Sequence, residues 1–305
     1  MKVSVLVDTN LLTMALFYFQ NFLHTLQYIT FRCMEGDKQK SLFIGPDSEE
    51  IRQTIDEVKE TKLVIRELSQ SLFRIGGFVF RGREGRILAS LSDAGFFLSG
   101  AILLGTHAFL SYQNVFGVRW GEIVFSLQTT DIDFAQLSRL RVGVPLDVAE
   151  SLKERLSEIN AHPIRRLLQA DEPPWGYVLQ EGGSIAFLSP LTEKNADADA
   201  PLSLPWEGVH AHPVRIMDYL IEDSFHAVAL LHRGAILVNL PDPGRFALHK
   251  LIVHEWQSAS ESVNQTKDLA QAGALIAFLS EKHPDVLVAA WMDLLKKHRA
   301  WGEIV

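Results

Sequence analysis

The stretch LLGTHAFLSYQNVFGVRW, residues 103–120, together with TTDIDF, residues 129–134, decides the fold of this 305-residue chain. A short apolar run ends at Gly105-Thr106, and a segment that is plausibly helical follows. The next apolar run, residues 122–134, carries Asp131 and Asp133. We therefore predict a strand, a glycine turn, a helix and a second strand, in this order.

The turn and the acidic pair each suggest a chemistry. A strand that passes through a glycine turn into a helix N-terminus offers backbone N–H groups to an anion. Asp131 and Asp133 would point to the same face of an extended chain, about 6.5–7 Å apart. Like charges at this spacing are not easily buried unless a cation lies between them. The pair alone is compatible with a solvated strand end or with a metal site.

The composition narrows the class of protein. Hydrophobic residues make up 47% and charged residues 22% of the chain, which is ordinary for a globular protein. The net charge of −8 argues against a surface built for nucleic acid. A single cysteine, Cys33, excludes an intramolecular disulfide and a cysteine zinc cluster, and this suits the cytoplasm. The histidines show no recognisable ligand spacing, so a metal would have to be held by oxygen.

The first residues contain an apolar stretch, LLTMALFYFQNFLHTLQYITF, residues 11–31. It carries polar residues throughout and has neither a basic n-region nor a cleavage site of small residues. We therefore expect an amphipathic or core helix here, and not a signal peptide or a membrane span.

The remaining pattern predicts an α/β (α+β) fold, in which a mixed sheet is flanked by N-terminal helices and a C-terminal helical region. Helices are expected from about Ser48 to Gly76-Gly77, over residues 84–98 and from Arg245 onward. Hairpins are expected around Gly182-Gly183 and Arg233-Gly234. We divide the chain into residues 1–98, an N-terminal helical region; 99–240, the α/β core; and 241–305, the C-terminal helices.

Several motifs resemble a bacterial branch of the nucleotidyltransferase-fold superfamily that is akin to AbiEii-type abortive-infection toxins. They lie between Phe73 and Leu279: FRIGGFVFRG, AGFFLSGAILLGTHAFLSY, TTDIDFA, AHPVRIMDYLIEDSFHAVAL, NLPDPGRFALHKLIV and KDLAQAGALI. The resemblance implies transfer of a nucleoside monophosphate from an NTP to a hydroxyl on RNA or protein, with no membrane involved. It also implies a toxin or defence role with an antitoxin-like partner protein.

The resemblance assigns roles to individual residues. Asp131 and Asp133 would be the catalytic residues and hold Mg²⁺ or Mn²⁺, because carboxylates on one strand face can bridge two such ions. Gly105, Thr106 and Lys250 would bind the nucleotide, since Gly105 lets the backbone approach the triphosphate and Thr106 can donate to it. Lys267 would be a second lysine near phosphate, although both lysines can equally be surface residues.

The chain departs from the family pattern at one position. Active nucleotidyltransferases usually have a third acid on a later strand beside the pair, and here Ala186 stands at the expected position. Ser184 shares its face but is a weak neutral ligand, while Asp171 or Glu172 could supply the acid from a loop.

Two hypotheses follow, with a third behind them. The chain is a Mg²⁺-dependent nucleotidyltransferase, or a catalytically degenerate member that binds a nucleotide or a partner without turnover. A purely structural or interaction protein is the third alternative, because the C-terminal helices have amphipathic faces.

Overall fold

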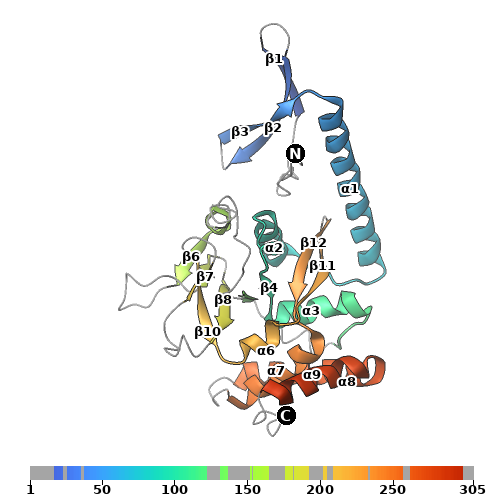
Figure 1. The fold of residues 1–305 in the computed structure, drawn as a ribbon, viewed down its shortest axis with the longest axis vertical. Helices are drawn as coiled ribbons and strands as arrows, with labels where there is room; N and C mark the ends of the chain where they lie inside the picture. Colours follow the sequence, from blue (N-terminus) through green and yellow to red (C-terminus); the bar gives the residue numbers. More distant parts are fainter. Residues whose placement is uncertain are drawn as a thin grey trace. The chain divides into compact units, whose positions relative to one another are not determined.

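The computed structural model describes residues 17–22, 26–35, 38–121, 131–136, 152, 154–164, 176–180, 182–191, 202–204, 209–232, 234–256 and 262–297. The chain forms two compact units, whose elements are labelled in Figure 1. The first comprises residues 1–94 and 230–236, and the second comprises residues 95–229 and 237–305. Our division of the chain into three regions stays a prediction.

The described part of the first unit begins with an antiparallel sheet. Its strands are β1 (Phe17–Phe22), β2 (Leu26–Glu35) and β3 (Lys38–Pro46), paired in this order. The helix predicted over residues 11–31 is therefore wrong in its described part, and the region 1–98 is not purely helical. The segment is rich in aromatic residues, which favour a strand when neighbouring strands are available to pair with it.

Two predicted helices of this unit are confirmed: α1 (Glu49–Arg74) and α2 (Gly82–Asp93). The Ser48 side chain caps α1 by accepting a hydrogen bond from the Ile51 amide at 3.3 Å. The chain leaves α1 through Gly76, whose φ of +99° suits a glycine at a helix end.

The first unit also contains the tip of a hairpin from much later in the chain. The Phe80 amide donates to the Leu230 carbonyl at 2.9 Å, and Phe80 forms a parallel bridge with Leu231. Phe80 is almost completely buried. Residues distant in sequence therefore complete this unit.

The second unit is built on a mixed sheet whose described strands follow the order β11-β12-β4-β5-β8-β10-β9, with β7 beside β8 and β6 beside β7. β5 pairs antiparallel with β4 and parallel with β8, and β8 continues parallel to β10. This confirms the predicted α+β class. The strands are β4 (Ile102–Leu103), β5 (Ile132–Ala135), β6 (Ala161–Ile164), β7 (Gly176–Leu179), β8 (Ser184–Pro190), β9 (Leu202–Ser203), β10 (His210–Val214), β11 (Phe225–Leu231) and β12 (Gly234–Leu240).

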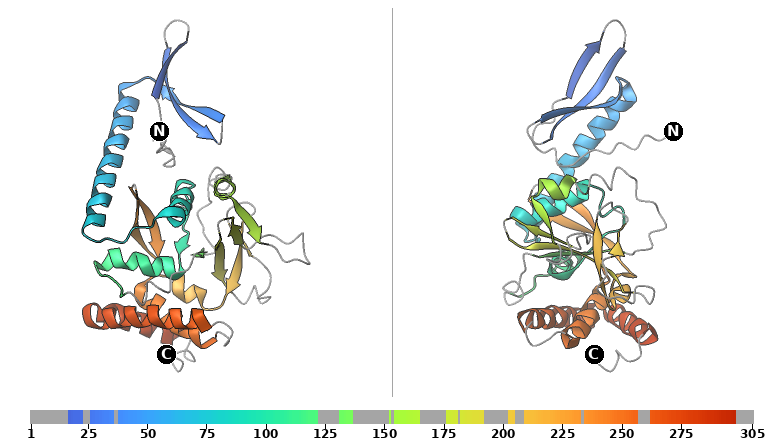
Figure 2. Two further views of the ribbon diagram at one scale, coloured as in Figure 1. Left: turned by 180° about the vertical axis from the view of Figure 1, so that it is seen from behind. Right: turned by 90° about the vertical axis from the view of Figure 1, so that its left-hand side faces the viewer.

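The described helices of this unit follow the predicted pattern, except for α6, which was not predicted. They are α3 (Gly105–Phe116), α6 (Met217–Ile221), α7 (Pro243–Trp256), α8 (Ser262–Lys282) and α9 (Pro284–Lys297). α8 and α9 both pack on α7, and the three helices lie together at one end of the unit, as Figure 1 and the further views in Figure 2 show. In the residues that the structure describes, we find no helix long and apolar enough to cross a membrane.

An aromatic cluster covers one face of the central strands. Phe134 on β5 and Phe187 on β8 are buried, and the ring of Phe96 packs edge-on against both, at centroid distances of 5.0 and 5.8 Å. The Asn239 amide donates to the carbonyls of Phe97 and Ala101, both at 2.8 Å, which fixes the segment that carries these aromatic residues. The opposite face of β5 and β8 is therefore left to the polar residues of the site.

Candidate functional site

β5 presents the acidic pair on one face, as the alternation of a strand requires. Ile132 and Phe134 are buried, whereas Asp133 is half-buried and Asp131, just before the strand, is exposed. The apolar side chains thus turn into the aromatic core, and the two carboxylates turn away from it. The separation of the two carboxylates, about 6.5–7 Å for an extended chain, stays a prediction.

The Gly105 turn lies directly against Asp133. The Leu104 amide donates to the Asp133 carbonyl at 2.8 Å, which ties the start of α3 to β5. Gly105 has a φ of +59°, and a Cβ atom at this position would meet Asp133 Oδ2 at 2.6 Å. Glycine is therefore required twice here, once by the backbone conformation and once by the carboxylate that lies over it. The N-cap residue of α3, Leu104, makes no capping hydrogen bond with its side chain.

Ser184 holds Asp131. Asp131 Oδ1 accepts hydrogen bonds from the Ser184 amide and the Ser184 hydroxyl, both at 2.9 Å. From the sequence alone, Ser184 is expected only as a weak ligand for a metal. The structure gives it a different role, because it fixes the orientation of the first carboxylate.

Ala186 lies beside Asp133, where a third acid was expected. β5 and β8 are paired with Asp133 opposite Ala186 and Ile132 opposite Ile185. Side chains of paired residues share a face of the sheet, so the Ala186 methyl group stands next to the Asp133 carboxylate. The predicted register is confirmed. Asp171 and Glu172, the alternative acids, lie outside the described residues.

Two lysines from the C-terminal helices act on the acidic pair. Burial raises the pKa of the Asp133 carboxyl, and the charges of Lys250 and His107 oppose this rise. Burial also lowers the pKa of Lys267, with a further lowering by Lys250, while Asp268, Asp133 and Asp131 act in the opposite direction. The structure therefore brings Lys250 and Lys267 within electrostatic reach of the strand.

The two lysines have different partners. Lys250 Nζ lies 2.5 Å from Asp268 Oδ1, and the side chains of Lys250 and Asp268 are only 14% and 5% exposed. The charge of Lys250, predicted to bind nucleotide, is thus largely matched by Asp268. Lys267, on the same helix as Asp268, is half-buried.

Thr106, at the start of α3, makes a contact that the sequence did not predict. Its side chain is buried, and its hydroxyl accepts a hydrogen bond from Gln271 Nε2 at 3.1 Å. The hydroxyl therefore connects α3 to α8, and its contact with a nucleotide stays a prediction. The part of the prediction that concerns the backbone amides at the start of α3 stays a prediction.

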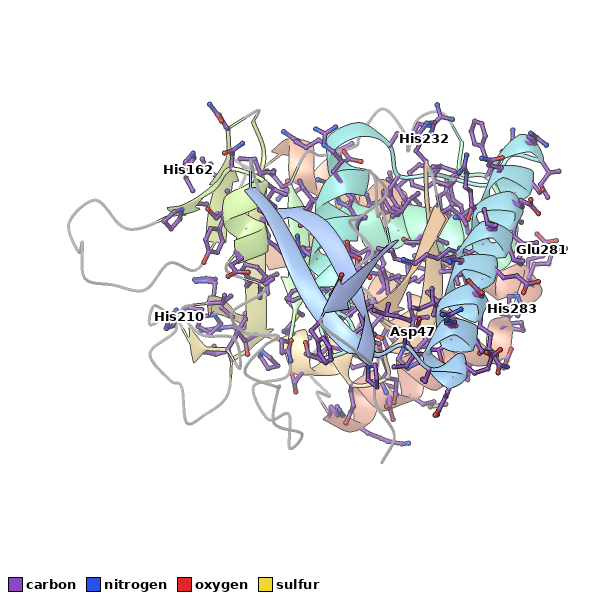
Figure 3. The ribbon with its side chains drawn as sticks, turned by 90° about the horizontal axis from the view of Figure 1, so that it is seen from above. Asp47, His162, His210, His232, Glu281 and His283 are labelled. Carbon is purple, nitrogen blue, oxygen red and sulfur yellow. The ribbon has the colours of Figure 1, made fainter. Side chains whose placement is uncertain are left out.

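Histidine does not supply a metal site in the described residues. No group of three or more His, Cys, Asp or Glu side chains within the described ranges is placed to hold a metal ion. Figure 3 shows His162 on β6 and His210 on β10 far from His283, which follows α8. Burial lowers the pKa of His249, on α7, to about 3, so that this ring is neutral. A cation at this site would be held by the oxygen atoms of Asp131 and Asp133, which are the hard ligands that Mg²⁺ prefers.

Sequence reasoning missed the contacts made by Ser184, Asp268 and Gln271. A signal for the last two was present in KDLAQ, because residues 268 and 271 are three apart and share a helix face. Buried Asp268 and Gln271 on one face suggest polar partners. The partners themselves, on α7 and α3, could not be read from this local spacing.

The comparison with protein families agrees with this geometry. A family model described as nucleotidyltransferase matches residues 83–296 and so includes every residue of the site. No curated protein and no solved structure matches the chain.

Proposed function

The chain belongs to the nucleotidyltransferase family, and from this premise we propose that its second unit binds an NTP with Mg²⁺ and transfers the nucleoside monophosphate to a hydroxyl on RNA or protein. The observation that carries the proposal is the placement of Asp131 and Asp133 on one strand face, with the Gly105 turn against Asp133. In nucleotidyl transfer, negative charge lies on the phosphate oxygens. Two carboxylates on one strand face can hold a cation that neutralises this charge.

Each group has a place in this reaction. The acceptor hydroxyl oxygen would form a bond to the α-phosphorus and lose its proton to water. The bond from the α-phosphorus to the oxygen that bridges to the β-phosphate would break, and pyrophosphate would leave. Asp131 and Asp133 would hold the cation, which when bound neutralises charge on the phosphates. The amides at the start of α3 would donate to phosphate oxygens, and Gly105 would let the backbone come close.

The lysines would divide the phosphate contacts. Lys267 is half-buried and sensitive to both carboxylates, so its ammonium group is well placed for a phosphate oxygen. Lys250 would contribute mainly by attracting the phosphates electrostatically from a distance, because Asp268 already contacts its Nζ atom. This assignment gives Lys267 the direct role that the sequence analysis gave to Lys250.

A second candidate is supported by one specific observation. Ala186 lies opposite Asp133 and can neither ligate a metal nor take a proton. The protein would then bind NTP without turnover. Removing a group that assists proton transfer typically costs about 10²–10⁴-fold in rate, which can turn an enzyme into a binding protein.

One experiment separates the two candidates. The purified protein is incubated with Mg²⁺ and each NTP in turn, labelled at the α-phosphate, with total RNA and lysate protein as acceptors. We expect label transfer that Asp131→Asn or Asp133→Asn lowers at least about 100-fold, since a lost metal contact is worth several kcal/mol. Asp56→Asn, which changes an exposed carboxylate on α1, is the matched control.

The alternative outcomes are equally informative. NTP binding without transfer would support the degenerate candidate, and absence of NTP binding would contradict both.

The toxin or defence role and the antitoxin-like partner are proposed from the resemblance alone. Expression of an active toxin would arrest growth, and Asp131→Asn would relieve the arrest; no arrest would contradict this role.

A further inference from the structure

We propose that Ser184 is itself an acceptor hydroxyl, so that the protein transfers a nucleoside monophosphate to its own strand β8. The inference rests on the proposed function, because it names an acceptor for the same site. Three features of the described residues carry it: the hydrogen bond between Ser184 and Asp131, the face of the sheet that they share, and the solvent access of the Ser184 side chain.

The first feature is the contact between the hydroxyl and the carboxylate. The Ser184 hydroxyl donates a hydrogen bond to Asp131 Oδ1, and the two oxygen atoms are 2.9 Å apart. The Ser184 amide donates to the same oxygen, also at 2.9 Å, so the serine is held at two points. A hydroxyl fixed beside the acidic pair does not have to diffuse to a bound NTP. Such proximity corresponds to an effective concentration of about 10⁵–10⁸ M in well-oriented cases, far above that of a dissolved acceptor.

The second feature is the shared face of β5 and β8. Asp133 is paired with Ala186, which lies two residues after Ser184, and side chains two apart on a strand point to one face. The Ser184 hydroxyl therefore lies on the side of the sheet that carries the carboxylates. The Thr106 hydroxyl, by contrast, is buried and accepts a hydrogen bond from Gln271. Ser184 is thus better placed than Thr106 to serve as an acceptor.

The third feature is the solvent access of Ser184. Its side chain is only half-buried, and Asp131 is exposed. Ser184 follows the Gly182-Gly183 turn, and a Cβ atom at Gly182 would have no described atom within 4 Å. Ser189, on the same strand, is completely buried. The described residues therefore leave the Ser184 hydroxyl open to a triphosphate from solvent.

The step needs no reactant beyond those of the proposed function. The Ser184 oxygen forms a bond to the α-phosphorus of the NTP, and its proton passes to water. The bond from the α-phosphorus to the oxygen that bridges to the β-phosphate breaks, and pyrophosphate leaves with that oxygen and the electron pair of the bond. The product is a negatively charged phosphodiester beside the Asp131 carboxylate. Because like charges repel, the modified chain binds a further NTP more weakly, and the reaction limits itself.

The test is the mass of the intact chain. The full-length protein is incubated with Mg²⁺ and each NTP in turn, without an added acceptor, and its mass is measured by mass spectrometry. We expect the addition of one nucleoside monophosphate per chain, and peptide fragmentation should locate it at Ser184. Because the NTP site and the acceptor belong to one chain, the rate constant should not change when the protein is diluted.

Three variants separate the hydroxyl from the fold. Ser184→Ala should abolish the addition, whereas Ser184→Thr keeps a hydroxyl and should be modified at the same position. Ser189→Ala is the matched control, because it removes a buried serine hydroxyl on the opposite face of β8, and it should be modified like the wild type. Circular dichroism shows whether each variant is folded. The modified wild-type chain should bind NTP at least about 10-fold more weakly than the unmodified chain.

Each outcome decides the inference. An addition at Ser184 that is lost in folded Ser184→Ala supports it. An unmodified wild-type chain, an addition at another residue, or a rate constant that falls on dilution overturns it. NTP binding is measured on the same samples by isothermal titration calorimetry. Normal NTP binding by a chain that stays unmodified contradicts only the inference, whereas absence of NTP binding contradicts the proposed function as well.

Discussion

At the scale of single residues, Gly105 is the most constrained position of the site. Its φ is +59°, and a Cβ atom would lie 2.6 Å from Asp133 Oδ2. Gly117, at the other end of α3, has a φ of +65°, but a Cβ atom there would meet nothing within 4 Å. Each Gly→Ala change should cost about 1–2 kcal/mol for the backbone conformation alone. We expect Gly105→Ala also to displace Asp133 and abolish NTP binding, whereas Gly117→Ala should bind normally. Urea unfolding and calorimetric titration measure the two effects; equal NTP binding by both variants would contradict this account.

At the scale of elements, α8 is held to its neighbours by two buried polar contacts. Gln271 donates to Thr106 on α3, and Asp268 pairs with Lys250 on α7. Asp268→Asn should destabilise the protein by about 3–5 kcal/mol, because it leaves a largely buried ammonium group without its carboxylate. The double change Lys250→Met/Asp268→Leu should cost much less, since it removes both charges. Urea unfolding of the two variants tests this, and Asp56→Asn in the exposed Lys59 pair should change little. Equal losses in the single and double variants would refute the explanation.

At the scale of the whole molecule, every residue of the site belongs to the second unit. A fragment beginning at Phe78 would retain that unit and the Phe80 pairing with the hairpin tip, and it would contain the whole region that matches the family. We expect this fragment to unfold cooperatively and to bind NTP with the affinity of the full chain. Circular dichroism during urea unfolding and calorimetric titration would measure these properties. A folded fragment that no longer binds NTP would show that the preceding residues contribute to the site.

The local features of the site could be predicted from the sequence. The order of β4, α3 and β5 follows from short-range signals, namely an apolar run, a glycine turn and a change of period. The shared face of Asp131 and Asp133 follows from the alternation of a strand. The position of Ala186 was predicted from the family resemblance, and the observed pairing with Asp133 confirms it.

Features that depend on distant pairing could not be predicted in this way. The Ser184 hydrogen bonds and the Lys250–Asp268 pair join segments whose approach no local pattern fixes. The sequence predicts a helix where β1 and β2 lie, because the apolar and polar residues of 11–31 do not alternate clearly. β2 pairs with both β1 and β3, and this pairing is a tertiary effect that overrides a weak local preference.

The hairpin tip that completes the first unit has a consequence for the timing of folding. Phe80 pairs with Leu230 and Leu231, which a ribosome adds about 150 residues later. At about 5–20 residues per second, this leaves an interval of roughly 8–30 s during synthesis. For that time the Phe80 amide is without its final acceptor, the Leu230 carbonyl. This pairing of the first unit therefore forms late in synthesis, although Phe80 itself is made early.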